Sequence, residues 1–345
     1  MSTLLPILPE ILLLVLGILL LTIDPFLKKS TWRGAFLGWF TTAGLLIVLL
    51  LSLLFTRPAD PIPAMGGMIR FDWLGFLFKI LFLFAGSVTA LFFMGSEKLS
   101  ERAEAYLLLL AAVLGMCLMA ASADLVMLYL AIETTSIPLY ILASMAYPRI
   151  ESEEAGLKYF LLGTFSSGFL LFGIALVYGA TTTTNLPQIV SFVSAGAYNP
   201  LLLLIGSALI LIGFGFKVAA VPFHTWTPDV YQGSPSPVSA FMSVGAKAAG
   251  FAALIRVFTL IFPSLSESLT PVFWVIAALT MIGGNVVAIA QTNLKRMLAY
   301  SSIAHAGYLL MAFVPFGDAA VRQNSIASAL FYLLAYALAS LGAWA

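Results

Sequence analysis

The feature that most constrains this sequence is a series of long apolar runs that contain very few charged residues. A helix needs roughly 20 mostly apolar residues to cross the hydrocarbon core of a bilayer. Eleven segments meet this requirement: 4–23, 34–55, 73–94, 105–121, 125–146, 155–179, 200–222, 237–262, 271–290, 297–315 and 325–345. The runs do not alternate with polar residues, so they predict helices and not the strands of a membrane barrel. We therefore expect an all-α polytopic membrane protein with about eleven transmembrane helices.

The composition of the 345 residues excludes several classes of protein. Hydrophobic residues make up 61% of the chain and charged residues 9%, whereas a soluble domain has about 45–50% apolar and about 25% charged residues. This balance excludes a soluble enzyme, a nucleic-acid-binding protein and a disordered chain. The net charge of +1 offers no strong field for an acidic partner. The single cysteine, Cys117, excludes a disulfide framework and an iron–sulfur site in this sequence.

Loop charges predict the orientation in the membrane, because basic residues gather in cytoplasmic loops. If the N-terminus lies outside, nine basic residues fall in inside loops and three in outside loops. The inside residues are Lys28, Lys29, Arg33, Lys98, Arg102, Arg149, Lys158, Lys295 and Arg296, and the outside residues are Arg57, Arg70 and Arg322. We therefore expect a periplasmic N-terminus in a bacterial inner membrane.

The two ends of the sequence carry further information. The first run contains Glu10 and lacks a basic leader and a small-residue cleavage site, so we interpret it as a retained helix and not a signal peptide. The last run, 325–345, is followed by no basic flank or polar tail. We therefore expect the natural chain to continue beyond this point.

Three ionisable residues, Glu133, Lys217 and Lys247, lie inside the apolar runs. Such residues cost several kcal/mol unless they are paired or hydrated, and they are functional candidates by default. Glu133 lies about 13 Å into its helix and Lys247 about 15 Å, which places both near the middle of the bilayer. A pair that serves only helix packing needs two charges, whereas a proton relay needs several groups whose protonation can change. We favour the relay and keep helix packing as the alternative for Glu133.

Lys217 also lies in a segment that predicts a broken helix. Gly213 and Gly215 precede it, and Pro222 follows it. Broken membrane helices free backbone groups and tolerate water where they line a cavity. A simple kink is the alternative, since proline is common in membrane helices.

His224, His305 and Lys158 are weaker candidates for the same path. An imidazole can accept and release protons near neutral pH. His224 lies past the predicted break beside Trp226, so a place in an interfacial aromatic belt is an equal alternative. His305 lies halfway along its helix, where a hydrogen-bonded packing role is the alternative. Lys158 begins a helix and either anchors it at the interface or modulates the buried carboxylate.

Two other basic residues of the runs, Lys79 and Arg256, lie closer to the predicted outer face. Long basic side chains can keep their carbon stems in the hydrocarbon while the charged group reaches the interface. We expect both side chains to extend to the interface in this way.

Sequence motifs for cofactors are absent. The sequence has no GxGxxG motif after a strand and no P-loop, which excludes the usual nucleotide sites. It has no HExxH motif and no Cys/His cluster for a metal. We therefore expect no cofactor and no metal in this chain.

Four segments together carry a resemblance to a known family. They are LAIETTSIPLYILASM (130–145), EAGLKYFLLGTFSSG (154–168), FKVAAVPFHTWTPDVYQGSPSPVSAFMSVGAKAAGFA (216–252) and NLKRMLAYSSIAHAGYLL (293–310). With these motifs the sequence resembles, along its whole length, subunit N of the proton-pumping NADH-quinone oxidoreductase, respiratory complex I. Subunits of multisubunit Na⁺/H⁺ antiporters and of membrane-bound hydrogenases share part of the pattern and remain the alternative. A purely structural membrane scaffold is a third possibility, weakened by the buried charges.

The resemblance implies a protein of fourteen helices with two inverted five-helix repeats and a broken seventh helix. In this frame 1–103 is an N-terminal three-helix segment, 104–265 the first antiporter-like repeat and 266–345 the start of a second, incomplete repeat. A weak echo of 156–173 in 329–345 agrees with this order.

The resemblance also implies roles for residues and partners. Glu133, Lys217 and Lys247 match the family's proton-carrying residues, whereas the family's twelfth-helix lysine has no counterpart before the sequence ends. The expected partners are the other membrane-arm and peripheral-arm subunits of complex I. FMN, the iron–sulfur clusters and quinone are expected in those partners.

Overall fold

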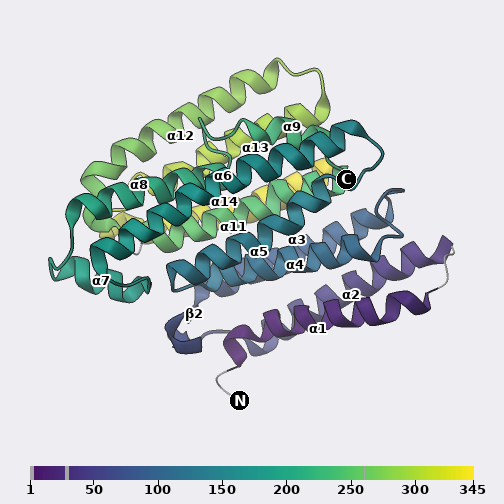
Figure 1. The fold of residues 1–345 in the computed structure, drawn as a ribbon, viewed down its shortest axis with the longest axis horizontal. Coiled ribbons are helices and arrows are strands. Elements are labelled where there is room, and N and C mark those ends of the chain that lie inside the picture. Colours follow the sequence, from purple (N-terminus) through teal and green to yellow (C-terminus); the bar gives the residue numbers. More distant parts are fainter. Residues whose placement is uncertain (1–3, 28–30, 260) are drawn as a thin grey trace.

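The computed structural model describes residues 4–27, 31–259 and 261–345, and these residues are almost entirely helical (Figure 1). The first half of the chain forms α1 (Leu8–Ile23), α2 (Thr31–Phe55), α3 (Trp73–Met94), α4 (Ala103–Ala121), α5 (Leu125–Ala143), α6 (Ile150–Thr181) and α7 (Leu186–Ser194). The second half forms α8 (Pro200–Lys217), α9 (Trp226–Gly233), α10 (Ser236–Phe241), α11 (Lys247–Leu254), α12 (Ser266–Ile289), α13 (Leu294–Leu310) and α14 (Ala319–Trp344). Lys28 and Lys29, which contribute to the loop-charge argument, lie outside the described residues.

Short elements complete the chain. Two π segments, η4 (Met242–Ala246) and η5 (Ile255–Thr259), flank α11. The 3₁₀ turns are η1 (Leu5–Ile7), η2 (Asp24–Phe26), η3 (Met65–Gly67), η6 (Pro263–Leu265) and η7 (Met311–Phe313). The strands β1 (Ile62–Ala64) and β2 (Ile69–Phe71) form a small antiparallel hairpin before α3.

The prediction of an all-α membrane protein is confirmed. Ten helical segments in the described part of the chain are long and apolar enough to cross a membrane. The remaining predicted run, 297–315, coincides with α13, which has 17 residues, and with the turn η7 that follows it. The predicted domain boundary after residue 265 falls between η6 and α12, but the division into repeats stays a prediction.

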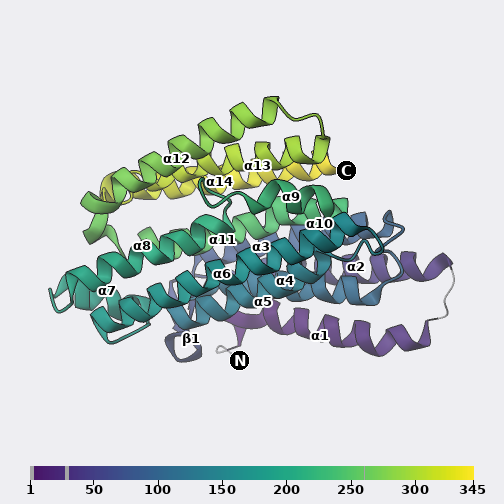
Figure 2. The ribbon, with the colours of Figure 1, turned by 45° about the horizontal axis from the view of Figure 1, so that its top comes forward.

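The long helices lie side by side in a single bundle (Figure 2). α1 lies along one edge of the bundle and α12 along the opposite edge in both views, and α2 packs between α1 and α3. α6 and α8 make an especially close pair, because Gly173 and Gly206 face each other: a Cβ on Gly173 would lie 2.8 Å from the carbonyl oxygen of Gly206. Small residues of this kind let membrane helices approach closely without a hydrophobic driving force.

The predicted helix break after Lys217 is also confirmed. α8 ends at Lys217, and Ala219 adopts a left-handed backbone conformation with φ of 60°. The chain then runs without regular helix until α9 begins at Trp226. The break therefore comes from the residues between Lys217 and Pro222, as the glycine and proline pattern indicates.

The segment from α10 through η4 and α11 to η5 is the most deeply buried span. It crosses the middle of the bundle against α3, α4, α8 and α14. π segments carry one residue more per turn than an α-helix and occur often at functional sites. This span carries Lys247, so the most deeply buried span in the fold also carries an ionisable residue.

Candidate functional site

Glu133 lies on α5, and its carboxylate points to α6. The Ser167 hydroxyl of α6 donates a hydrogen bond to Glu133 Oε1 at 2.5 Å. Asp124 caps the start of α5 by accepting from the backbone N–H groups of Val126 and Met127. This cap fixes where the helix begins, and so it fixes the depth of Glu133 in the bundle.

Lys217 is the last residue of α8, and its amine reaches back to α5. Its Nζ donates to the Ser136 hydroxyl at 2.7 Å and lies 3.5 Å from the Tyr140 hydroxyl. Ser136 follows Glu133 by three residues, so both side chains are on the same face of α5. No direct ion pair joins Glu133 to Lys217 among the described residues; the Ser136 hydroxyl accepts from Lys217 and donates to the Ile132 carbonyl at 2.6 Å.

Lys247 begins α11 and is almost completely buried, with a relative exposure of 2%. Its amine donates hydrogen bonds to the hydroxyl and the backbone carbonyl of Ser302 on α13. Gly250, one turn along α11, brings this helix against α8: a Cβ there would lie 3.5 Å from Cβ of Lys217. The helices that carry the two lysines, α8 and α11, are therefore in direct contact.

His305 lies on α13, three residues after Ser302, and belongs to the same polar region. Its Nδ1 is 2.5 Å from the Tyr332 hydroxyl of α14, and its ring lies 4.8 Å from the Tyr336 ring. These side chains line a cavity of about 350 Å³ between α13 and α14. The polar groups thus continue from Lys247 through Ser302 to His305 and two tyrosines.

The other weaker candidate on a helix, Lys158, does not lie beside Glu133. Its Nζ pairs with Glu154 at 2.6 Å and with Asp229 at 2.8 Å, and Arg296 pairs with the other oxygen of Asp229 at 2.7 Å. Burial raises the pKa of Asp229, but the hydrogen bonds from Lys158 and Arg296 outweigh it and hold that pKa below its ordinary value. Lys158 is therefore part of a partly exposed charge network that joins α6, α9 and α13.

His224 lies in the irregular segment between α8 and α9. Burial lowers the pKa of its imidazole, although a hydrogen bond involving the Pro222 backbone acts in the opposite direction. The neighbouring Trp226 is buried and stacks on Tyr159, with ring centroids 4.5 Å apart. The interfacial aromatic belt, one of the two expectations for this segment, is therefore wrong for Trp226.

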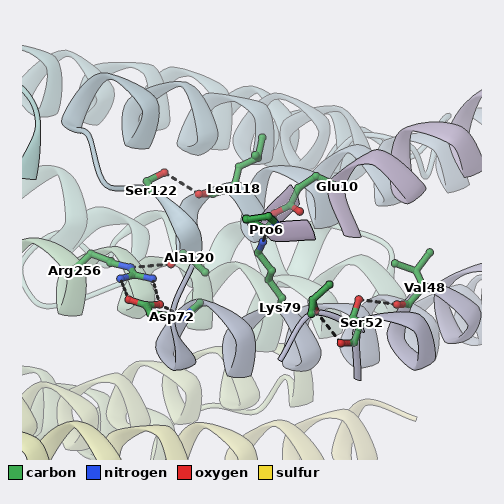
Figure 3. Close-up of polar contacts among 12 residues, drawn as sticks. Pro6, Glu10, Val48, Ser52, Asp72, Lys79, Leu118, Ala120, Ser122 and Arg256 are labelled. Atoms are coloured by element: carbon green, nitrogen blue, oxygen red, sulfur yellow. Dashed lines mark hydrogen bonds and ion pairs between the residues drawn. The ribbon is translucent and has the colours of Figure 1, made fainter. Parts of the chain in front are cut away.

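The expectation that Lys79 and Arg256 reach the interface is wrong for both residues. Lys79 lies 2.7 Å from Glu10 of α1, and the side chains are 7% and 5% exposed (Figure 3). Arg256 makes two parallel bonds to Asp72, at 2.5 and 2.6 Å, and its side chain is 1% exposed. Each charge meets a carboxylate inside the bundle, which stabilises it without contact with the interface.

Several residues of the site escaped the sequence reasoning, and all of them carry hydroxyl groups. Ser136 had a local signal, because it follows Glu133 at helical spacing. The others show their role only in three dimensions, since their partners lie on other helices. They are Ser167, Ser302, Tyr332 and Tyr336.

The described residues include no cluster of three or more His, Cys, Asp or Glu side chains able to hold a metal ion. The available chemistry is instead that of amines, a carboxylate, an imidazole and hydroxyls. Such groups can pass a proton over hydrogen-bond distances when water or a hydroxyl bridges them. The arrangement is that of an ion-translocating membrane protein with titratable groups in its core.

Comparisons with known proteins identify the class and then the family. Residues 122–345 match the family model for the transmembrane region of NADH:quinone oxidoreductase and Mrp antiporter proteins. The chain is 43% identical over 343 residues to NADH-quinone oxidoreductase subunit N of Trichlorobacter lovleyi, covering 98% of this chain and 68% of that relative. The chain belongs to the NADH-quinone oxidoreductase subunit N family.

Solved structures support the same fold. A chain of respiratory complex I from Thermus thermophilus, with bound aureothin, matches with a TM-score of 0.80 and 38% identity, over 97% of this chain and 69% of that one. A chain of the Mrp complex from a Dietzia species matches with a TM-score of 0.84 at 20% identity, over 98% of this chain and 62% of that one. The second likeness concerns the fold alone. The chain spans about two thirds of the length of these relatives.

Proposed function

We propose that this chain translocates protons in the membrane arm of an NADH:quinone oxidoreductase, driven by electron transfer in partner subunits. The observation that carries the proposal is the surroundings of Lys217 and Lys247. Both amines lie in spans, and in the described residues they contact hydroxyl and carbonyl groups and no carboxylate. An amine inside a span with no carboxylate in direct contact is poorly stabilised when charged, so it can be neutral as well as protonated.

The proposed route has three parts. Protons enter near the broken helix, where Lys217 and the partly buried His224 lie. They pass between α8 and α11 to Lys247, because Gly250 brings these helices into contact. They continue through Ser302 to His305 and the tyrosines of α14. Glu133, hydrogen-bonded to Ser167 and one turn from Ser136, adjusts the charge on Lys217 from α5.

The redox chemistry belongs, in this proposal, to other subunits. FMN, iron–sulfur clusters and quinone lie in the membrane-arm and peripheral-arm partners, and this chain contributes no redox centre. A bacterial inner membrane and a periplasmic N-terminus are part of the same proposal, and the orientation of the N-terminus rests on the loop charges.

The test is to neutralise each central charge in the assembled enzyme. In Lys217→Met, Lys247→Met and Glu133→Gln variants, we expect NADH-driven proton pumping into inverted membrane vesicles to fall by about tenfold or more. Lys98→Met, which removes an exposed loop lysine, is the matched control and should pump normally. Normal pumping in all three variants, at wild-type enzyme content, would refute the proposal.

A second candidate function is that of a Na⁺/H⁺ antiporter or membrane hydrogenase subunit, favoured by the fold likeness to the Mrp complex. The discriminating measurement is the driving force. Proton movement that requires NADH and quinone supports the oxidoreductase, whereas proton movement driven by an imposed Na⁺ gradient without NADH supports the antiporter. Co-purification with flavin and iron–sulfur proteins gives a second, independent readout.

A further inference from the structure

The buried guanidinium of Arg256 ties together three elements that are far apart in the sequence. Its two Nη groups bind the two carboxylate oxygens of Asp72 at the start of α3, and its Nε donates to the Ala120 carbonyl near the end of α4 at 2.8 Å (Figure 3). Arg256 itself belongs to the π segment η5. Parallel bonds between guanidinium and carboxylate fix orientation as well as distance.

The surroundings are built to accept this side chain. Gly75, in the first turn of α3, leaves the space that the guanidinium occupies: a Cβ there would lie 3.1 Å from Arg256 Nη2 and 3.3 Å from Asp72 Oδ1. The Asp72 carboxylate is also held from its own side, because Oδ1 accepts the Gly75 backbone N–H at 2.9 Å. Asp72 therefore has little freedom to follow a movement of Arg256.

The helix that Arg256 anchors is the one that carries Lys247. Arg256 follows Lys247 by nine residues, or about 13 Å along the helix axis. The intervening residues form the uninterrupted helix α11. At the other end, beyond Lys247, the π segment η4 packs against α3, α4 and α14, and the Ser243 hydroxyl lies 3.2 Å from the Ser340 hydroxyl of α14. The end at Arg256 is thus held by ionic bonds, whereas η4 is held by packing and neutral contacts.

We infer that Arg256 is a positioning residue: with Asp72 it sets the depth and rotation of α11, so that the Lys247 amine meets Ser302. The inference rests on the proposed function, because only there is Lys247 a proton carrier. A slip of one residue along the axis would move Lys247 by about 1.5 Å, enough to break a hydrogen bond to Ser302. Misplacement on this scale can cost a catalytic step about 100-fold.

The competing explanation is that the Asp72–Arg256 pair only stabilises the fold. The chain offers a second ion pair as a matched control for this explanation. Glu10 and Lys79 form another deeply buried ion pair, on α1 and α3. Neither α1 nor α3 carries a residue of the proposed route. Loss of that pair removes the same kind of interaction and leaves the anchor of α11 in place.

The experiment measures the position of α11 by disulfide formation. In the protein within the assembled enzyme in its membrane, Ser243→Cys and Ser340→Cys are introduced into a Cys117→Ala background, and the yield of disulfide is measured under mild oxidation. We compare Asp72→Asn/Arg256→Gln with Glu10→Gln/Lys79→Met, each of which replaces both charges of a pair. Protons pumped per electron are measured in the same two double variants without the introduced cysteines.

We expect Asp72→Asn/Arg256→Gln to lower the disulfide yield by about threefold or more and the pumping ratio by about tenfold, and the control to change neither. Arg256→Lys, which keeps the charge but loses the parallel bonds, should lie between. If the double variant does not assemble, Gly75→Ala tests the same anchor, because its methyl group presses on the guanidinium. Unchanged disulfide yield in an assembled variant overturns the inference. Reduced yield with normal pumping supports the anchor and instead refutes the role of Lys247 in the proposed function.

Discussion

Two groups of buried charges in this protein are stabilised in different ways. The flanking pairs, Glu10–Lys79 and Asp72–Arg256, join each cation directly to a carboxylate at 2.5–2.7 Å. The central lysines, Lys217 and Lys247, have hydroxyl and carbonyl partners among the described residues. All four cations are in spans, so depth alone does not explain the difference.

The difference shows what each group can do. A carboxylate in contact with a buried cation offsets the cost of burying its charge, so the flanking pairs stabilise the contacts between their helices. A hydroxyl can donate or accept and imposes no charge on its neighbour. The contrast therefore supports the proposal that the central lysines exchange protons, whereas the flanking pairs hold helices in place.

The largest expected effect comes from removing only the cation of one flanking pair, which leaves its carboxylate in place. Lys79→Met leaves Glu10 buried without its cation, which should destabilise the protein by about 3–5 kcal/mol. Glu10→Gln/Lys79→Met removes both charges and should recover most of that loss. The readouts are the amount of assembled enzyme on native gels and its thermal unfolding midpoint. Equal losses in the single and double variants would remove the contrast with the central lysines.

A smaller effect is expected where a central lysine loses one of its two contacts. Ser302→Ala removes the hydroxyl that Lys247 binds and leaves the backbone carbonyl. One hydrogen bond to a charged group is worth about 1.5 kcal/mol, so we expect pumping to fall by roughly tenfold. Ser302→Thr keeps a hydroxyl and is the control. A normal rate in Ser302→Ala would mean that the carbonyl alone positions Lys247.

The smallest effect concerns the partly exposed network around Asp229. Its pKa lies below the ordinary value, so its contribution to stability is complete above about pH 4 and is lost as the pH falls through the lowered pKa. At neutral pH, Asp229→Asn should cost less than about 1 kcal/mol, because solvent screens exposed pairs. Thermal midpoints at pH 7, 5 and 4 should show a constant difference from wild type that begins to shrink only at the lowest pH. A difference that disappears already at pH 5 would contradict this account.

The sequence predicts the helices well, because each span can be recognised from its own residues. An apolar run of the right length needs no knowledge of its neighbours. The break after Lys217 is equally local, although α8 continues through Gly213 and Gly215 and ends only at Lys217, before Pro222. The depths of Glu133 and Lys247 within their spans follow from counting residues along their helices.

Contacts between helices could not be predicted in the same way. Asp72 and Arg256 are 184 residues apart, and no periodicity indicates that α3 and η5 meet. For the same reason Lys79 looked like a residue of the interface, although its partner Glu10 was visible in the first run. The hydroxyls that surround the central lysines are ordinary in composition, so only their position in the bundle distinguishes them.

The glycine at position 250 has a mechanical consequence. A Cβ there would lie 2.9 Å from the Val218 side chain, at the point where α8 has just ended. The irregular stretch that follows Lys217 is thus in close contact with α11. A displacement of α11 towards α8 would push this stretch directly. Such a displacement would reach the loop that carries His224 by steric contact, without a chain of polar groups.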